Sequence, residues 1–331
     1  MKKALVTGAA GFIGSHVVRQ LLDANVEVRA LIRPGEEAAN LDGLEVERIE
    51  GDVLNADKIK QAVSGVDTVF HLAAIYAIWM PDWRRIYEVN IQGSRNVLWA
   101  AFQSDQVERV VFTSSISALG IAPGKALSNE ETPFNQYTLG SHYVLTKYLS
   151  QQEALGFARN GLDLVVVNPA FPFGPNDIGP TPTGKVLIDI VSGVNRTAFD
   201  GGMNIVDVRD VARGHILAAE KGKTGECYIL GNQNVTVTEL MKMVHQASGK
   251  KGAFIPKVPF TLLKGATSAM ALWADHVSKK PPMSTPVEVT YASNYLFFDN
   301  TKAKTELGLD VRPVETSIKE SIDWFKSRGM I

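Results

Sequence analysis

The sequence is poor in cysteine, in net charge and in long apolar runs. Its 331 residues contain one cysteine, Cys227, which excludes an internal disulfide and a zinc site built from several thiolates. The 34 basic and 35 acidic residues nearly cancel and are spread along the chain, so nothing indicates a nucleic-acid partner. No apolar run reaches the roughly 18 residues that a membrane-spanning helix needs. We therefore expect no membrane span and no metal site.

The first residues leave little room for a secretion signal. Residues 1–3 lead directly into a glycine-containing segment, whereas a signal peptide needs an apolar stretch and a cleavage site. We therefore expect a cytoplasmic protein. Residues 259–277 are mostly apolar but are interrupted by Lys264 and Asp275. We interpret them as a helix that covers a pocket or the core, which favours an apolar ligand, and contact with a membrane surface is the alternative.

Three glycines near the N-terminus predict a nucleotide site. Residues 4–6 have the character of a buried strand, and residues 15–24 have the apolar spacing of a helix. Between them, Gly8 can make a tight turn, Gly11 lets backbone N–H groups approach a pyrophosphate, and Gly14 lets the helix pack closely on the strand. The N-terminus of the helix would then face the phosphates. A dinucleotide is the predicted ligand, and an ordinary glycine-rich turn is the alternative.

The end of the next predicted strand bears on which dinucleotide is bound. That strand covers residues 26–33, and Ile32 occupies the position where an acidic residue binds the ribose 2′-hydroxyl in NAD-binding proteins. Arg33 follows it, and an arginine there accommodates the 2′-phosphate of NADP. NADP(H) is therefore preferred. NAD(H) stays possible, because Glu36 and Glu37 lie just beyond and would repel a phosphate.

Two further strand ends offer cofactor contacts. Asp52 follows the predicted strand 46–49 and is placed to accept a hydrogen bond from an adenine amino group, although it could equally cap the predicted helix 56–64. The predicted strand 66–72 runs into His71-Leu72-Ala73-Ala74, whose small residues permit a cofactor to lie across the strand end. His71 itself is expected to be a packed structural residue.

A tyrosine and a lysine four residues apart predict proton-transfer chemistry. Tyr143 and Lys147 lie in the predicted helix 140–159, where this spacing places both side chains on one face. We expect the ammonium group to stabilise the phenolate and lower the pKa of Tyr143, so that it becomes a usable proton donor and acceptor. The predicted strand 107–112 ends in three hydroxyl residues, 113–115, which would face the same site.

The rest of the chain is predicted to bind the substrate. The strand 162–167 leads into a segment rich in proline and aromatic residues, 168–175, which would pass over the cofactor. Asp207 and Asp210 are expected to cap the helix that follows them rather than to act in catalysis. His16, His142 and His215 lack partners at metal-ligand spacing. Helices are expected at residues 83–103, 186–192, 238–247, 259–277, 301–307 and 317–326.

Together these motifs resemble the extended short-chain dehydrogenase/reductase family over nearly the whole chain. The chain looks most like its dihydroflavonol-reductase-like branch, and especially the bacterial hopanoid-associated sugar epimerases, to which residues 28–33 and 177–184 are similar. The family resemblance rests on residues 7–14, 51–52, 71–74, 113–115, 143–147 and 168–169.

The resemblance implies an α/β fold, a doubly wound parallel Rossmann sheet of seven strands with a smaller C-terminal substrate domain. We assign residues 1–170 to the NADP-binding domain, which later strands from about 204–235 join, and residues 171–331 to the substrate-binding domain. The resemblance also implies a homodimer, in which the long helices around Asn90 and Tyr143 pair into a four-helix bundle.

The resemblance further implies roles for individual residues. Tyr143 would exchange a proton with the substrate oxygen, Lys147 would hold the nicotinamide ribose, and Ser115 would bind the carbonyl. Cofactor contacts are expected from Gly8, Gly11, Phe12, Ile13, Arg33, Asp52, Val53, Leu72, Ala73, Ala74, Thr113, Ser114, Tyr143, Lys147, Pro169 and Phe171. The substrate is expected to contact Ile75, Tyr76, Trp79 and Phe173.

Three functions compete at this stage. The first is an NADPH-dependent reductase of a ketone or aldehyde, reversible as an alcohol dehydrogenase and acting on a small, apolar carbonyl or alcohol. The second is a nucleotide-sugar epimerase or dehydratase with tightly bound NAD, in which Arg196 or Arg209 would grip the diphosphate. The third is a redox sensor without catalysis, a class that typically lacks the tyrosine and is therefore disfavoured by Tyr143.

Overall fold

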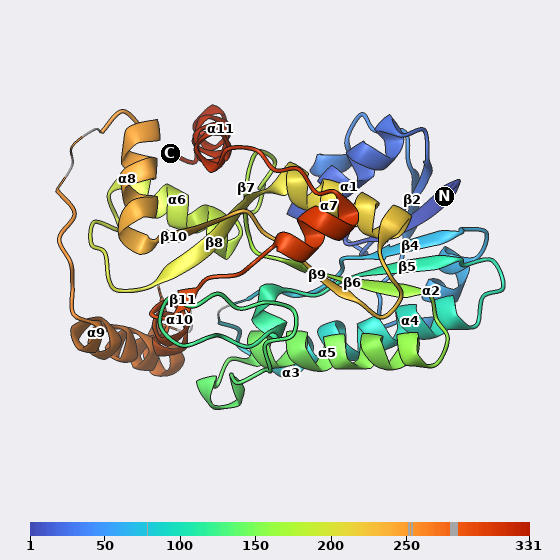
Figure 1. Ribbon diagram of the computed structural model, residues 1–331, viewed down its shortest axis with the longest axis horizontal. Helices are drawn as coiled ribbons and strands as arrows, with labels where there is room; N and C mark the ends of the chain where they lie inside the picture. The colour runs from blue at the N-terminus through green and yellow to red at the C-terminus, as the bar shows by residue number, and fades with distance from the viewer. Residues whose placement is uncertain (78, 251, 253, 279–283) are drawn as a thin grey trace.

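Two β-sheets organise the chain (Figure 1). The computed structural model describes residues 1–77, 79–250, 252, 254–278 and 284–331. Its larger sheet has seven parallel strands in the order β3-β2-β1-β4-β5-β6-β9, which confirms the predicted doubly wound fold. The strands are β1 (Lys3–Thr7), β2 (Glu27–Ile32), β3 (Glu47–Glu50), β4 (Thr68–His71), β5 (Arg109–Thr113), β6 (Leu164–Pro169) and β9 (Cys227–Leu230).

Helices cover both faces of this sheet, and the strands are apolar on both sides. Ala4 and Val6 of β1 belong to one hydrophobic core, whereas Leu5 between them belongs to another. This alternation follows from the two-residue period of a strand and is typical of a sheet buried on both faces. The helices α1 (Phe12–Asp23) and α7 (Val208–Lys221) pack on one face; α2 (Ala56–Val63), α4 (Ser94–Phe102) and α5 (His142–Arg159) pack on the other (Figure 1).

The predicted long helix 83–103 forms with a widened turn in its middle. It begins as α3 (Arg84–Tyr87), continues as a π-helical segment (Glu88–Gly93) and ends as α4. Asn90 lies in the π segment, and its amide side chain accepts a hydrogen bond from the backbone N–H of Ile75 at 2.7 Å and donates to the carbonyl of Ile75 at 3.1 Å. The π turn therefore fixes the segment that follows β4, at the edge of the sheet where ligands bind in such folds.

The smaller sheet is built around β8 (Gly202–Asp207), which pairs with three other strands. Of the segment 204–235, β9 joins the seven-stranded sheet, whereas β8 and β10 belong to the smaller one. The reason is packing, because Ile205 and Val235 share a third core with Phe173. The other strands are β7 (Phe171–Phe173), β10 (Gln233–Thr236) and β11 (Tyr295–Leu296), and the helices in this core are α6 (Pro182–Ser192), α8 (Val237–Ala247) and α11 (Val314–Ser327).

Helices α9 (Phe260–Trp273) and α10 (Pro286–Ala292) lie together at one edge of the molecule (Figure 1). A π turn (Ala274–Ser278) extends α9. Among the described helices, none is both long and apolar enough to cross a bilayer. The same part of the chain holds no cluster of three or more metal-binding side chains. Short turns of 3-10 helix occur at Ala39–Leu41, Ile116–Ala118 and Tyr137–Leu139, and a further π turn at Ala303–Leu307.

Candidate active site

Two of the three N-terminal glycines, Gly8 and Gly14, occupy positions that other residues could not adopt. Gly8 has a φ of +67°, and a Cβ there would lie 2.9 Å from the backbone nitrogen of Ala73. A Cβ on Gly14 would lie 2.0 Å from the carbonyl oxygen of Gly8, far inside van der Waals contact. Helix α1 begins beyond Gly11 with no side chain capping its N-terminus. The free N–H groups and the open turn therefore fit a pyrophosphate.

A cavity of about 400 Å³ extends from this turn across the ends of the central strands. This volume lies within the range of small-molecule sites. It brings together most of the residues that the sequence predicts for cofactor and substrate. The predicted residues in its lining are Gly8, Gly11, Phe12, Ile13, Leu72, Ala74, Tyr76, Thr113, Ser114, Ser115, Tyr143, Lys147, Pro169, Phe171 and Phe173.

Tyr143 and Lys147 both face this cavity from α5, which Ser141 caps at its N-terminus. Lys147 is 6% exposed, and its ammonium group donates to the carbonyl oxygen of Thr113 at 3.0 Å. Burial lowers the pKa of Lys147 to about 8. Burial also raises the pKa of Tyr143, and a hydrogen bond with Ser115 offsets this only in part. The expected lowering of the pKa of Tyr143 is therefore wrong for this structure, because loss of solvent outweighs the hydrogen bond with Ser115.

Two serines follow β5 in the cavity wall. The hydroxyl of Ser115 accepts a hydrogen bond from the backbone N–H of Ser117 at 3.1 Å and donates to its hydroxyl at 3.1 Å. The hydroxyl of Ser114 is buried and has no hydrogen-bond partner among the described residues. A buried hydroxyl without a partner is costly unless a ligand satisfies it. Ser114 therefore supports the fit of a polar ligand across the end of β5.

Arg33 and Asp52 lie outside the cavity lining. Arg33 is exposed at the end of β2, and its backbone N–H donates to the carboxylate of Glu36 at 3.1 Å. The carboxylate of Asp52 forms an ion pair with Arg85, with 2.9 Å between the paired nitrogen and oxygen. The alternative that Asp52 caps the next helix is wrong, because Asn55 caps α2 through a bond from the backbone of Lys58.

Four other predicted contacts also lie outside the lining: Val53, Ala73, Ile75 and Trp79. Val53 packs beneath the π segment, where a Cβ on Gly93 would lie 2.6 Å from its side chain. The backbone of Ala73 supports Gly8, and Ile75 is held by Asn90. Val53, Ala73 and Ile75 therefore support residues next to the cavity without lining it themselves.

The sequence did not indicate the far half of the cavity. Tyr291 donates a hydrogen bond to the hydroxyl of Ser117 at 3.3 Å, and burial raises its pKa to about 12. Tyr76, which the sequence does predict as a substrate contact, lies with its ring 4.6 Å from that of Tyr143, and the residue is 41% exposed and lines the cavity. Gly14, Ala170 and Pro172 also line the cavity and belong to segments that the sequence predicts for the cofactor. The other residues missed are Ile116, Ser117, Ser141, Val144, Thr181, Pro182, Thr183, Val186, Gly202, Met203, Thr285, Val287, Glu288, Ala292, Leu296 and Ala77.

Charge is scarce in this cavity. Among the described residues that line it, Lys147 and Glu288 are the only charged ones. The carboxylate of Glu288 accepts from the backbone N–H of Thr285 at 2.8 Å, as part of the capping box of α10, and burial raises its pKa. The spacing Thr285-x-x-Glu288 is a capping signature that can be read in a sequence. The cavity therefore offers an apolar space with hydroxyl groups beside Tyr143.

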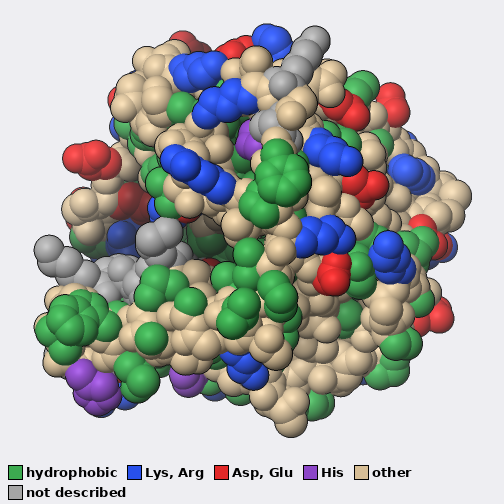
Figure 2. Space-filling view, turned by 90° about the vertical axis from the view of Figure 1, so that its left-hand side faces the viewer, with side chains coloured by type: hydrophobic (Ala, Val, Ile, Leu, Met, Phe, Trp, Pro, Cys, Tyr) green, Lys and Arg blue, Asp and Glu red, His purple; other side chains and the backbone are tan. Residues whose placement is uncertain are grey.

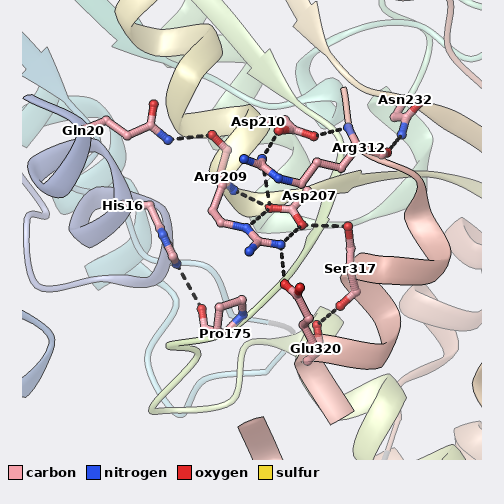
Figure 3. A network of polar contacts seen from close by, with 11 residues as sticks. His16, Gln20, Pro175, Asp207, Arg209, Asp210, Asn232, Arg312, Ser317 and Glu320 are labelled. Atoms are coloured by element: carbon pink, nitrogen blue, oxygen red, sulfur yellow. Dashed lines mark hydrogen bonds and ion pairs between the residues drawn. The ribbon is translucent and has the colours of Figure 1, made fainter. Parts of the chain in front are cut away.

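The two arginines considered for a sugar diphosphate are engaged elsewhere. Arg196 donates to the carbonyl of Gly193 at 2.6 Å. Arg209 pairs with Asp207 at 2.6 Å and with Glu320 at 2.5 Å, as Figure 3 shows. Asp207 also accepts from the backbone N–H of Arg209 at 2.8 Å and from Ser317 at 2.7 Å, which confirms its expected capping of α7. This network links α7 to α11 outside the cavity lining.

The buried histidines have structural partners. Both ring nitrogens of His71 make hydrogen bonds, to Thr7 at 2.8 Å and to Ser94 at 2.9 Å, and burial lowers its pKa to about 3. His215 binds Thr113 at 2.9 Å. His16 on α1 binds the carbonyl of Pro175 at 3.0 Å (Figure 3), and burial lowers its pKa to about 4. Each histidine therefore ties a strand or helix to its neighbour.

Comparisons with known proteins cover almost the whole chain. The sequence profile of the NAD dependent epimerase/dehydratase family matches residues 4–231. A Synechocystis sp. protein that carries a dihydroflavonol 4-reductase name is 34% identical and covers 98% of this chain and 95% of its own. The sterol demethylase protein B of Methylococcus capsulatus is 34% identical and covers 99% of both chains. The solved structure of a nucleoside-diphosphate-sugar epimerase from Pseudomonas aeruginosa is 25% identical, with a TM-score of 0.83, and covers 100% of this chain and 99% of its own.

Proposed function

Because the chain belongs to the NAD dependent epimerase/dehydratase family, within the extended short-chain dehydrogenases/reductases, we propose that this oxidoreductase is an NADPH-dependent reductase of an apolar ketone or aldehyde. It would act in reverse as an alcohol dehydrogenase. The observation that carries the proposal is the position of Tyr143, Ser115 and Lys147 beside a cavity in which Lys147 is the only basic group among the described lining residues. Two relatives support it, since one is named as a reductase and the other for a sterol, an apolar compound.

The chain's own residues supply the proton chemistry of this proposal. The reduced nicotinamide, when bound, supplies the hydride. Burial keeps Tyr143 protonated at neutral pH, so it starts as the proton donor that reduction of a carbonyl requires. Ser115 would turn its hydroxyl proton from Ser117 to the same oxygen as negative charge develops there. Ser117 and Tyr291 hold Ser115 in place through their hydroxyl groups.

Lys147 acts in this proposal by binding and charge. Its ammonium group is fixed by Thr113 at the end of β5, and Ser114, whose hydroxyl is unpaired, lines the same cavity. From there it would hold the ribose of the cofactor and stabilise the phenolate after the proton has left Tyr143. The other predicted lining residues would contact the dinucleotide along the floor of the cavity.

NADP(H) is the proposed cofactor, with NAD(H) as the alternative. Arg33 is exposed at the end of β2, and Ile32 stands where an acid would bind the ribose 2′-hydroxyl. The test is titration of NADPH and NADH against the wild type and Arg33→Ser. We expect the variant to lose affinity for NADPH and keep its affinity for NADH. Equal losses for both would contradict the preference.

The second candidate is a nucleotide-sugar epimerase or dehydratase. The likeness to the Pseudomonas aeruginosa epimerase favours it. It would require a cationic group for the diphosphate, and the described lining offers none besides Lys147. The two functions differ in the cofactor that survives purification. Denaturation of fresh protein should release no dinucleotide if the reductase is right, whereas stoichiometric NAD⁺ would favour the epimerase.

The test of the chemistry is Tyr143→Phe on a panel of apolar ketones and aldehydes. We expect turnover to fall about 10²–10⁴-fold while the dissociation constant of NADPH is unchanged, because only the proton donor is lost. Tyr137→Phe is the matched control, since Tyr137 is 62% exposed and lies outside the cavity lining. Retained turnover in Tyr143→Phe would refute the assignment.

A homodimer through α4 and α5 is proposed as the assembly. Trp99, Phe102 and Leu149 expose large apolar side chains on these two helices. Burial of such a patch is a common reason for association. Light scattering should give twice the chain mass of 36.0 kDa, and a monomer would contradict the proposal.

A further inference from the structure

Helix α9 presents an unusual surface at the edge of the molecule. It packs on α10, and Thr267 is its one buried residue. Figure 2 shows hydrophobic side chains in a row over this edge, below a hollow in the surface. Lysine or arginine and histidine side chains lie near the row in this view.

Large apolar side chains are exposed on α9 and on the π turn that extends it, beside the exposed polar side chains of Thr261 and Lys264. Leu262 is 66% exposed, Trp273 is 62% exposed and Val277 is 57% exposed. Ala266 and Ala269 lie between them at helical spacing and are exposed as well. A surface helix ordinarily turns polar residues to water and apolar residues to the protein. In α9 much of the outward face is apolar, so water is an unfavourable neighbour for it.

The sequence around α9 is rich in lysine and poor in acidic residues. Residues 250–280 contain six lysines and a single acidic residue, Asp275, in a chain whose net charge is −1. Lys264 on α9 lies with its ammonium 5.9 Å from the ring centre of Phe260, and Lys257 just before the helix pairs with Asp200 at 3.3 Å. Exposed leucine and tryptophan flanked by lysine are typical of helices that lie in the interface of an anionic membrane.

The apolar face adjoins the substrate end of the cavity. α9 packs on α10, and Val287, Glu288 and Tyr291 of α10 line the cavity. Only α9 and α10 therefore lie between the cavity and a ligand or surface that binds the outer face of α9. This arrangement would place the entrance for an apolar molecule next to whatever covers α9.

We propose that α9 docks on the surface of an anionic lipid bilayer. Leu262, Leu272 and Trp273 enter the boundary between head groups and acyl chains, and Lys257 and Lys264 contact the phosphates. The helix lies in the interface and does not cross it. This inference is independent of the proposed reductase activity, because it concerns binding to lipid without substrate or cofactor.

The test is flotation of the full chain with vesicles. Wild type should float with vesicles of phosphatidylglycerol and phosphatidylcholine at low salt, and much less at high salt or with phosphatidylcholine alone. The triple variant Leu262→Ser, Leu272→Ser, Trp273→Ser should partition about tenfold or more weakly, because three inserted apolar side chains are lost. Leu127→Ser is the matched control, since Leu127 is 53% exposed and lies far from α9 in the sequence.

A second variant separates charge from apolar insertion. Lys257→Glu with Lys264→Glu keeps every apolar side chain of α9 and should weaken binding to the phosphatidylglycerol vesicles by a similar factor. Circular dichroism checks that each variant is folded. The proposal is overturned if wild type does not float with anionic vesicles, or if the triple variant floats as well as the control. It is also overturned if the triple variant changes only the oligomeric mass in light scattering, which would assign α9 to contact between copies.

Discussion

Replacing Lys147 by methionine should make the protein more stable while it removes activity. The ammonium group of Lys147 is 6% exposed, and burial lowers its pKa from 10.5 to about 8. Since each pH unit corresponds to about 1.4 kcal/mol, holding this charge inside the folded protein costs about 3 kcal/mol at neutral pH. Methionine has a similar length and carries no charge, so Lys147→Met removes this cost.

The gain is reduced by the bond that Lys147 makes. Its ammonium group donates to the carbonyl of Thr113, and a buried acceptor left without a donor costs about 1–3 kcal/mol. The net stabilisation expected at pH 7 is therefore about 1 kcal/mol. Turnover should fall sharply, because the positive charge beside Tyr143 is gone. Stability and activity would then change in opposite directions at one residue.

The pH dependence gives this prediction its signature. Because the pKa is lower in the folded state, the unfolded chain binds the additional proton between pH 8 and 10.5, and the stability of wild type rises with pH across that window. The advantage of Lys147→Met should therefore be full below pH 8 and shrink toward pH 10. Urea unfolding at pH 7, 8.5 and 9.5 measures it, with exposed Lys60→Met as the control. A difference that does not vary with pH would refute the reasoning.

Two further predictions concern α1. Gly14→Ala should destabilise the protein by about 3 kcal/mol or more and abolish NADPH binding, because its Cβ would lie 2.0 Å from the backbone of Gly8. The control is Gly265→Ala in α9, whose Cβ meets no atom within 4 Å and which should stabilise the protein by up to about 1 kcal/mol. Thermal unfolding that ranks the two variants otherwise would contradict this prediction. The pKa of His16 is lowered from 6.5 to about 4 in the folded protein. Between these values the unfolded chain binds the additional proton, so the stability of wild type falls as the pH falls from 6.5 to 4. His16→Gln, whose amide can still donate to Pro175, should therefore gain about 3 kcal/mol relative to wild type between pH 7 and pH 4 in urea unfolding, and a constant difference would argue against it.

The nucleotide-binding half could be predicted because its signals are local. The strand, turn and helix around Gly8 follow one another directly in the sequence, and the structure confirms the steric reasons for Gly8 and Gly14. Tyr143 and Lys147 share a face because a helix turns once in about four residues. The apolar run at residues 164–167 is completely buried between two helical layers, as its composition predicts.

The substrate half could not be predicted because it is assembled from distant segments. Thr183, Met203 and Tyr291 meet in one cavity although more than 100 residues separate the first from the last. They meet because β8 pairs with three strands from different parts of the chain, which no local pattern indicates. The pKa of Tyr143 was misjudged for a similar reason, since the sequence shows the neighbouring lysine but not the depth of burial.

The position of β9 determines the order in which the protein can mature during synthesis. The chain leaves the large sheet after β6, builds β7 and β8 of the small sheet, and returns only at residue 227 to add the last strand. The side chain of Asp207 is fully buried, and its hydrogen-bond network is completed later still. Its partner Ser317, and Glu320, which pairs with Arg209, are translated near the end of the chain. A ribosome-bound chain of about 170 residues therefore exposes an unpaired edge at β6. Both halves reach their final form together, once α11 has emerged.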